Sequence, residues 1–192
     1  MKNIILGLAA SALLLSACNS ETKPDGKAVT DSTAATLEGS IDTKATESGT
    51  GKIVVAYLQM KNALAKDDDK QTAEAGKVLV QTISMVNTQS LSPDQSKVFA
   101  DVSDDVKEHG EHISDNAGNI KHQREHFEML SKDIYDLVKA GGSTGQKLYL
   151  THCPMYNNNK GANWLSETKE ISNPYLGKAM PDCGTIKEEL SK

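Results

Sequence analysis

The chain has 192 residues, of which 24% are charged and 4% aromatic, and its formal net charge at pH 7 is −5. A nucleic-acid partner requires a basic face, so this acidic balance argues against one. Residues 51–192 have the length of one domain with one hydrophobic core.

The first 17 residues have the pattern of an export signal. Lys2 supplies the positive charge, and Ile4–Leu15 forms an apolar run that is too short for the ~20 apolar residues of a membrane-spanning helix. Leu15-Ser16-Ala17-Cys18 resembles the lipobox of bacterial lipoproteins, whose cysteine is lipidated before cleavage. We therefore expect a signal peptide over 1–17 and a lipid anchor at Cys18, with Asn19 compatible with sorting to the outer membrane. An ordinary secreted protein with a chance cysteine at this place is the less favoured alternative.

A polar segment follows the anchor. Residues 19–50 contain no aromatic residue and only three large aliphatic ones, so they lack the apolar surface that would offset the entropy of ordering them. We interpret 18–50 as the lipidated cysteine and a flexible tether. The membrane is then contacted only through the lipid, and 51–192 is the functional domain.

Four amphipathic helices are predicted between residues 51 and 140. The charged run 66–70 ends the first, Ser92-Pro93 is a typical N-cap with proline in the first helical position, and 116–119 is a turn. Glycines in 141–145 end the fourth. The apolar positions are Ile53, Tyr57, Met60 and Leu64; Ala75, Leu79, Ile83 and Val86; Phe99, Val102, Val106, His109 and Ile113; and Ile120, Phe127, Leu130, Ile134 and Leu137.

This order of elements predicts an all-α fold, an antiparallel four-helix bundle with an irregular C-terminal cap. Residues 147–150 suit either one more helical turn or a short strand. The rest of the cap is expected to be loops, with a short helix near 186–190.

Three histidines form the first candidate metal site. His122 and His126 are four residues apart and share a helical face, and Met129 follows on the same side. A turn at 117–119 places His112 opposite about position 125, close to His126. This geometry can hold a metal ion, although the pattern alone favours solvated surface histidines. His109 falls within the apolar stripe and is expected to be a packed, hydrogen-bonded core residue.

Two cysteines with two methionines form the second candidate site. In an exported domain, Cys153 and Cys183 suit a disulfide that closes a loop of about 30 residues and contributes ~3 kcal/mol. They also suit a soft-metal site for Cu(I) or Ag(I), with Met155 and Met180 as further ligands. The spacing leaves both interpretations open. It does not suit a zinc ribbon, because the chain has no Cys-x-x-Cys pair.

Six motifs resemble a bacterial domain of unknown function found on secreted lipoproteins and fused to periplasmic adaptors of copper and silver efflux systems. The resemblance implies a metal-binding role for Cys153, Met155, Met180 and Cys183, together with His112, His122 and His126. It departs at Tyr156, where a small residue is expected in many relatives. The motifs are His-Gln-Arg-Glu-His-Phe (122–127), Leu-Ser-Lys-Asp (130–133), Cys-Pro-Met (153–155), Gly-Ala-x-Trp-Leu-Ser (161–166), Glu-Ile-x-Asn-Pro-Tyr (170–175) and Met-x-x-Cys-Gly (180–184).

The sequence thus predicts a lipid-anchored protein of the bacterial envelope that binds a soft metal ion, Cu(I) or Ag(I). It would act as a buffer or as a donor to a periplasmic efflux adaptor, with no organic cofactor. No nucleophile–base pair or pair of carboxylates indicates an enzyme. The main alternative is a disulfide-stapled module that binds another envelope protein without metal, and a copper-dependent redox enzyme is a weaker third.

Overall fold

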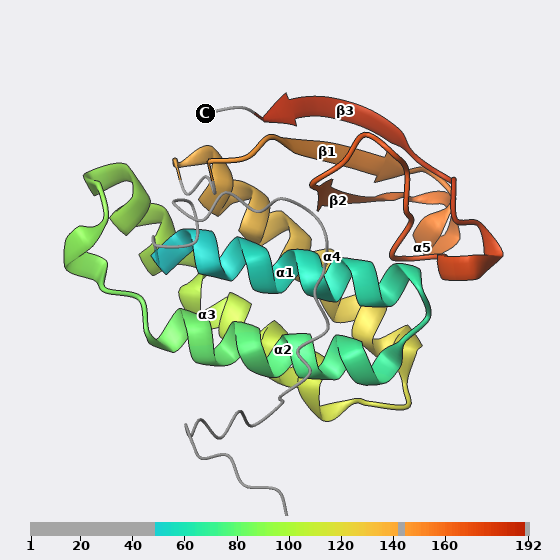
Figure 1. Cartoon of the computed structure of the whole chain (residues 1–192), viewed down its shortest axis with the longest axis horizontal. Helices are drawn as coiled ribbons and strands as arrows, with labels where there is room; N and C mark the ends of the chain where they lie inside the picture. Colours follow the sequence, from blue (N-terminus) through green and yellow to red (C-terminus); the bar gives the residue numbers. More distant parts are fainter. Residues whose placement is uncertain (1–48, 142–144, 191–192) are drawn as a thin grey trace, which may run out of the picture. The chain divides into compact units, whose positions relative to one another are not determined.

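The computed structural model describes residues 49–141 and 145–190, and these residues are mostly helical. Four long helices follow one another: α1 (Gly49–Ala65), α2 (Asp69–Ser84), α3 (Pro93–Asp115) and α4 (Ile120–Lys139). Each packs against the next in sequence, and α4 also packs against α1 (Figure 1). Among the described residues, no helix has the length and apolarity needed to cross a membrane. The predicted signal peptide, the lipid anchor at Cys18 and nearly all of the predicted tether lie outside the described residues.

The predicted apolar stripes form the core. Thirteen of the eighteen positions are less than 7% exposed, and Phe99 and Val102 are 9% and 8% exposed. The prediction for Val86 was wrong, because α2 ends at Ser84 and Val86 lies in the following connection, partly buried. Helices α2 and α3 approach closely where two glycines face each other. A Cβ at Gly76 would lie 2.9 Å from the carbonyl oxygen of Gly110, so only glycine fits there without a shift.

Side-chain caps set the helix ends. The hydroxyl of Ser92 accepts a hydrogen bond from the backbone of Gln95, whose side chain accepts one from the backbone of Ser92, a capping box with Pro93 in the first turn. Asn119 caps α4 by accepting from the backbone of His122. The predicted start of α3 and the predicted turn before α4 are therefore confirmed.

The C-terminal cap is a three-stranded antiparallel sheet, so the prediction of an irregular cap was wrong. Strand β1 (Leu148–Cys153) lies between β2 (Ala162–Ser166) and β3 (Thr185–Leu190), with Cys153 paired to Ala162 and Leu148 to Leu190. The expected short helix at 186–190 is β3, because pairing with β1 overrides the weak helical pattern of this charged segment. The alternative of a strand at 147–150 is the one observed.

The sheet lies against α1 and α4, on the side away from α2 and α3 (Figure 1). Buried polar contacts fix it there. Lys61 on α1 is 2% exposed and its ammonium lies 2.8 Å from the carboxylate of Glu167, directly after β2. The hydroxyl of Tyr57 accepts a hydrogen bond from the backbone of Leu165 and lies 2.9 Å from the hydroxyl of Ser131 on α4.

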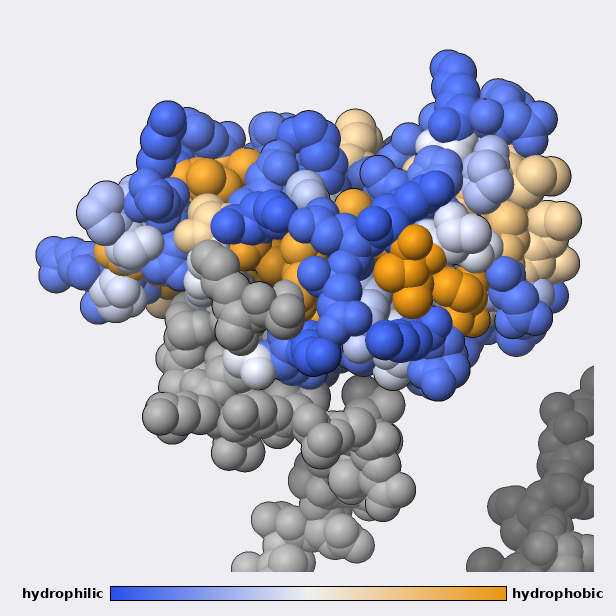
Figure 2. Space-filling model, turned by 90° about the horizontal axis from the view of Figure 1, so that it is seen from above, coloured by the Kyte–Doolittle hydropathy of each residue, from blue (hydrophilic) through white to orange (hydrophobic). Residues whose placement is uncertain are grey.

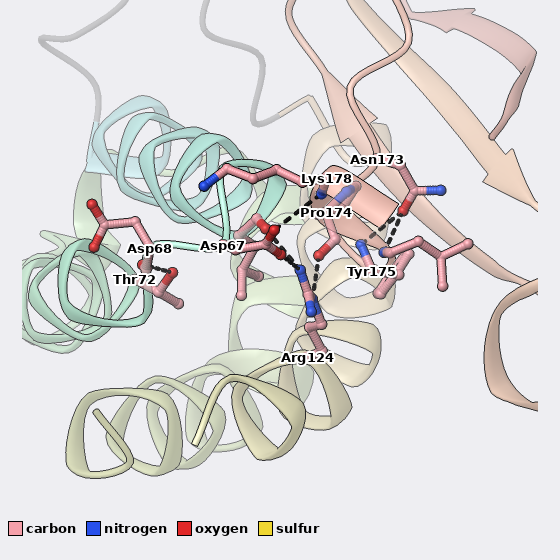
Figure 3. A network of polar contacts seen from close by, with 10 residues as sticks. Asp67, Asp68, Thr72, Arg124, Asn173, Pro174, Tyr175 and Lys178 are labelled. Atoms are coloured by element: carbon pink, nitrogen blue, oxygen red, sulfur yellow. Dashed lines mark hydrogen bonds and ion pairs between the residues drawn. The ribbon is translucent and has the colours of Figure 1, made fainter. Parts of the chain in front are cut away.

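A second attachment joins the helices to the segment before β3 (Figure 3). Arg124 on α4 donates to the carbonyl oxygens of Pro174 and Leu64 and to the carboxylate of Asp67, which also accepts from the backbone of Lys178. Gly177 lies so close to this network that a Cβ there would be 2.0 Å from Oδ1 of Asp67. The cap is thus attached to the helices at two places, and its strand β2 packs against α4. The face seen in Figure 2 is largely hydrophilic, with small separate hydrophobic areas.

Candidate metal site

Helices α3 and α4 bring His112, His122 and His126 together. One ring nitrogen from each lies within 4.8 Å of the other two. The rings of His112 and His126 stack with centroids 4.2 Å apart, and His122 meets His126 edge-on at 4.6 Å. The short turn between the antiparallel helices produces this contact, as the sequence predicted. Two histidines one helical turn apart and one from the facing helix therefore form a single cluster.

His109 is a fourth member that the sequence analysis assigned to the core. It is only half-buried, and its Nδ1 lies 3.2 Å from Nδ1 of His126. His109 is hydrogen-bonded, as expected, but its partner is His126 of the cluster and not a group in the core. The signal that could have found it is the spacing of His109 and His112, which lie three residues apart on α3 and face the pair on α4.

The cluster keeps His126 uncharged. Burial, followed by the neighbouring His112, His122 and His109, lowers the pKa of His126 to about 4. A neutral imidazole has a free lone pair, which is the form that binds metal ions. Two carboxylates lie beside the outer rings: Glu108 is 3.9 Å from Nε2 of His112, and Glu125 is 3.6 Å from Nδ1 of His122. Carboxylates in such positions orient ligating histidines and raise their basicity.

The lowered pKa of His126 predicts a loss of stability in mild acid. In the unfolded chain the group titrates near its ordinary value of 6.5, and in the folded chain near 4. As the pH falls below 6.5, the unfolded state gains a proton that the folded state does not, so the free energy of unfolding decreases. Urea unfolding between pH 8 and about pH 5 measures this slope, above the range where Glu167 and Asp67 titrate. His126→Asn should flatten the slope, and an unchanged slope would contradict the assignment.

The two cysteines also meet. Cys153 closes β1 and is fully buried, Cys183 precedes β3 and is partly exposed, and their sulfur atoms are 2.9 Å apart. Burial raises the pKa of the Cys153 thiol, but hydrogen bonds from Cys183, from the backbone of Met155 and Tyr156 and from Asn173 outweigh it, so the net shift is downward. The same sulfur–sulfur hydrogen bond raises the pKa of Cys183. Cys153 is thus the sulfur favoured to carry negative charge.

The methionines predicted beside these thiols lie at the surface. The side chain of Met155 is 50% exposed and that of Met180 is 44% exposed. Over residues 49–141 and 145–190, only the three histidines form a group of at least three His, Cys, Asp or Glu ligands close enough for one ion. The structure therefore divides the predicted ligands into a histidine cluster on α3 and α4 and a thiol pair in the cap.

The histidine cluster fits a metal ion once its rings turn toward a common point. Three nitrogens bound to one ion at about 2.1 Å lie ~3.5 Å from one another, so nitrogens that are now up to 4.8 Å apart have to approach by about 1.3 Å. The exposed or half-buried rings have room to turn, since the side chain of His112 is 46% exposed and that of His122 is 32% exposed. Imidazole suits copper, zinc, nickel and iron, and the exposed thioether of Met129, one turn beyond His126, adds a soft donor.

Residues 53–146 match the model of a protein family described as Protein of unknown function (DUF3347). The match supports the predicted resemblance to a domain-of-unknown-function family. It covers the four long helices from Ile53 onward, including all members of the histidine cluster, and ends before β1 and the thiol pair. No curated protein and no solved structure matches the chain.

Proposed function

We propose that this domain binds a copper ion as cargo, with His112, His122 and His126 as the donors. The observation that carries the proposal is the convergence of three imidazole nitrogens from two helices within 4.8 Å. The neutral state of His126 and the two flanking carboxylates support it, because they are the features of histidines arranged to ligate.

The exposure of the cluster favours exchange of the ion over permanent retention. His112 and Met129 are nearly half-exposed, so an incoming or outgoing ligand can reach the ion from solvent. A buffer or a donor to another protein needs such access, whereas a structural site is usually closed. This supports the role of a metal buffer or donor, and we do not propose an enzyme.

The setting completes the proposal and rests on the sequence. We place the domain in the bacterial envelope, anchored through a lipid on Cys18. The domain is then an antiparallel four-helix bundle that presents the histidine cluster on its surface. The resemblance to domains fused to efflux adaptors suggests a periplasmic copper or silver efflux system as the recipient. Cys153 and Cys183, with Met155 and Met180, form the second set of soft donors and favour Cu(I) or Ag(I).

Copper titration of the reduced full chain tests the proposal. Under anaerobic conditions with a competing Cu(I) chelator, we expect at least one ion per chain, and X-ray absorption then identifies the donors. A first shell of nitrogen at about 2.0 Å indicates the histidine cluster, and sulfur at about 2.3 Å indicates the thiol pair. Absence of binding under reducing conditions would refute the function, and a purely sulfur shell would refute the assignment to the histidines.

The close contact of the thiols favours the second candidate, a disulfide-stapled module that binds another envelope protein. Oxidation would replace the 2.9 Å contact between Cys153 and Cys183 by a covalent bond that joins the end of β1 to the start of β3. Thiol labelling of protein taken directly from the cell distinguishes the states. If both cysteines are blocked to the reagent and the chain binds no copper, this second function is correct and the first is wrong.

The thiol pair also gives a prediction for single variants. Cys153→Ser and Cys183→Ser should each remove the sulfur component of copper binding while leaving the nitrogen component intact, because the two clusters are separate. Met155→Leu and Met180→Leu keep the side-chain volume but remove sulfur, so a loss of affinity there reports ligation. If a serine variant abolished nitrogen ligation as well, the two clusters would have to act as one site.

A further inference from the structure

A pocket of about 630 Å³ lies between α4 and the turn that follows Cys-Pro-Met. Its size is in the range of sites for small organic ligands. Tyr156 and Tyr175 form an aromatic wall, with ring centroids 4.5 Å apart and planes inclined by 25°. The pocket adjoins the histidine cluster but no histidine lines it: Glu125 and Met129 border both, and the other residues that line the pocket are not part of the cluster. It is also the place where the sequence departs from the expected pattern of its relatives, at Tyr156.

The pocket is lined by charges of both signs that the protein leaves incompletely paired. Glu128 forms no ion pair with any described residue and makes only 3.4 Å contacts to the amide of Asn157. Lys121 is 89% exposed, and its one ion pair, with Glu125, is 3.8 Å long. Exposed pairs of this kind contribute little, so Lys121 is available to another partner.

Arg124 adds a second available cation. Its Nε and Nη2 atoms hold the cap, whereas Nη1 makes no hydrogen bond within the part of the chain that the structure describes. A guanidinium binds carboxylates well because its donors lie in one plane. Along α4 the pocket therefore offers the carboxylate of Glu128 and, one and two helical turns before it, the cationic groups of Arg124 and Lys121.

The opposite wall is a turn of unusual backbone conformation. Asn157, Asn158 and Asn159 all have positive φ, at 50°, 56° and 64°. Asparagine tolerates this left-handed region better than most residues, but three in succession are uncommon, and such conformations concentrate at ligand sites. The turn places the amides of Asn157 and Asn158 in the pocket lining, and the hydroxyl of Tyr156 makes no hydrogen bond to a described residue.

We propose that this pocket binds a small zwitterion, an amino acid or short peptide with a free ammonium and a free carboxylate. Glu128 receives the ammonium, and Lys121 and Nη1 of Arg124 receive the carboxylate. The side-chain amides of Asn157 and Asn158 and the hydroxyl of Tyr156 form hydrogen bonds with the peptide group between the two charged ends of the ligand. A ligand with one charge would pair with either Glu128 or the cationic groups and leave the other without a partner.

Titration of the full chain with four related probes tests this inference. Dialanine carries both charges, N-acetyl-dialanine only the carboxylate, dialanine amide only the ammonium, and N-acetyl-dialanine amide neither. We expect dialanine to shift the backbone amide NMR signals of 121–129 and 156–158, and each blocked end to weaken binding about tenfold. Free alanine distinguishes an amino-acid site from a peptide site. If the natural ligand is a peptide, dialanine should bind more tightly than alanine, because only the longer ligand reaches both charged groups.

Matched variants locate the binding. Glu128→Gln should weaken dialanine binding and leave that of N-acetyl-dialanine unchanged, whereas Lys121→Gln should weaken dialanine binding and leave that of dialanine amide unchanged. Glu74→Gln, at an exposed position of α2 that does not line the pocket, is the control and should change binding of none of these probes. The inference is overturned if dialanine causes no shift at millimolar concentration, or if dialanine amide binds as well as dialanine, which would indicate a site for organic cations.

Discussion

Replacement of His126 by alanine is expected to lower the affinity of the reduced chain for copper at the nitrogen site by at least about 100-fold. His126 is the centre of the cluster: its ring stacks on His112, meets His122 edge-on and contacts His109. Removing it takes away one of the three proposed donors and leaves His112 and His122, on different helices, without the ring that contacts both. Competition with a Cu(I) chelator measures the affinity, and X-ray absorption measures the nitrogen content of the remaining site.

His152 supplies the matched control. It lies on β1, outside the cluster, and its Nδ1 is 2.8 Å from the side-chain oxygen of Asn163. His152→Ala removes the same ring but none of the proposed donors, so the affinity should stay within about twofold of the parent. His109→Ala tests the fourth histidine of the cluster. A large loss of copper affinity in this variant would show that His109 is also a ligand. Equal losses for His126→Ala and His152→Ala would show that the cluster is not the site.

The helical part of the fold and the histidine cluster could be predicted because both depend on local periodicity. Residues such as Ile53, Leu79 and Ile134 repeat at helical spacing, and the turn at 116–119 is short, so the position of His112 opposite His126 follows from counting residues. His109 was misassigned for the same reason. It occupies a position of the apolar repeat of α3, and no neighbouring residue in the sequence indicates that α3 and α4 are partly exposed to solvent at this end.

The cap could not be predicted because its contacts join distant parts of the chain. Strand β3 is charged and mostly exposed, and it becomes a strand by pairing with β1, more than thirty residues earlier. The same pairing brings Cys183 to Cys153. Lys61 is buried only because Glu167, 106 residues later, provides a carboxylate 2.8 Å away. Contacts between residues so far apart in the sequence leave no recognisable pattern within the residues of a single helix or strand.

Arg124→Met is expected to destabilise the domain by about 3 kcal/mol, chiefly by releasing the cap from the helices. The Arg124 side chain is 13% exposed and holds two carbonyl oxygens and a carboxylate from two segments of the chain, the end of α1 with its following turn and the segment before β3 (Figure 3). Methionine fills much of the volume but leaves these acceptors without a donor, and Asp67 loses the cation that lowers its pKa. Urea unfolding gives the free energy, and limited proteolysis shows whether cleavage begins in the cap.

Two further variants separate the effect of geometry from that of charge. Arg124→Lys keeps the positive charge, but one ammonium does not reach Pro174, Leu64 and Asp67 together, so we expect it to recover only part of the stability. Lys132→Met, on the same helix, breaks an exposed pair with Asp136 and should change stability by less than about 0.5 kcal/mol. If Arg124→Met were as mild as Lys132→Met, the cap would be held by the sheet contacts of β2 with α1 and α4 alone. The attachment through Lys61 and Glu167 would then be the one that positions the thiol pair and the pocket.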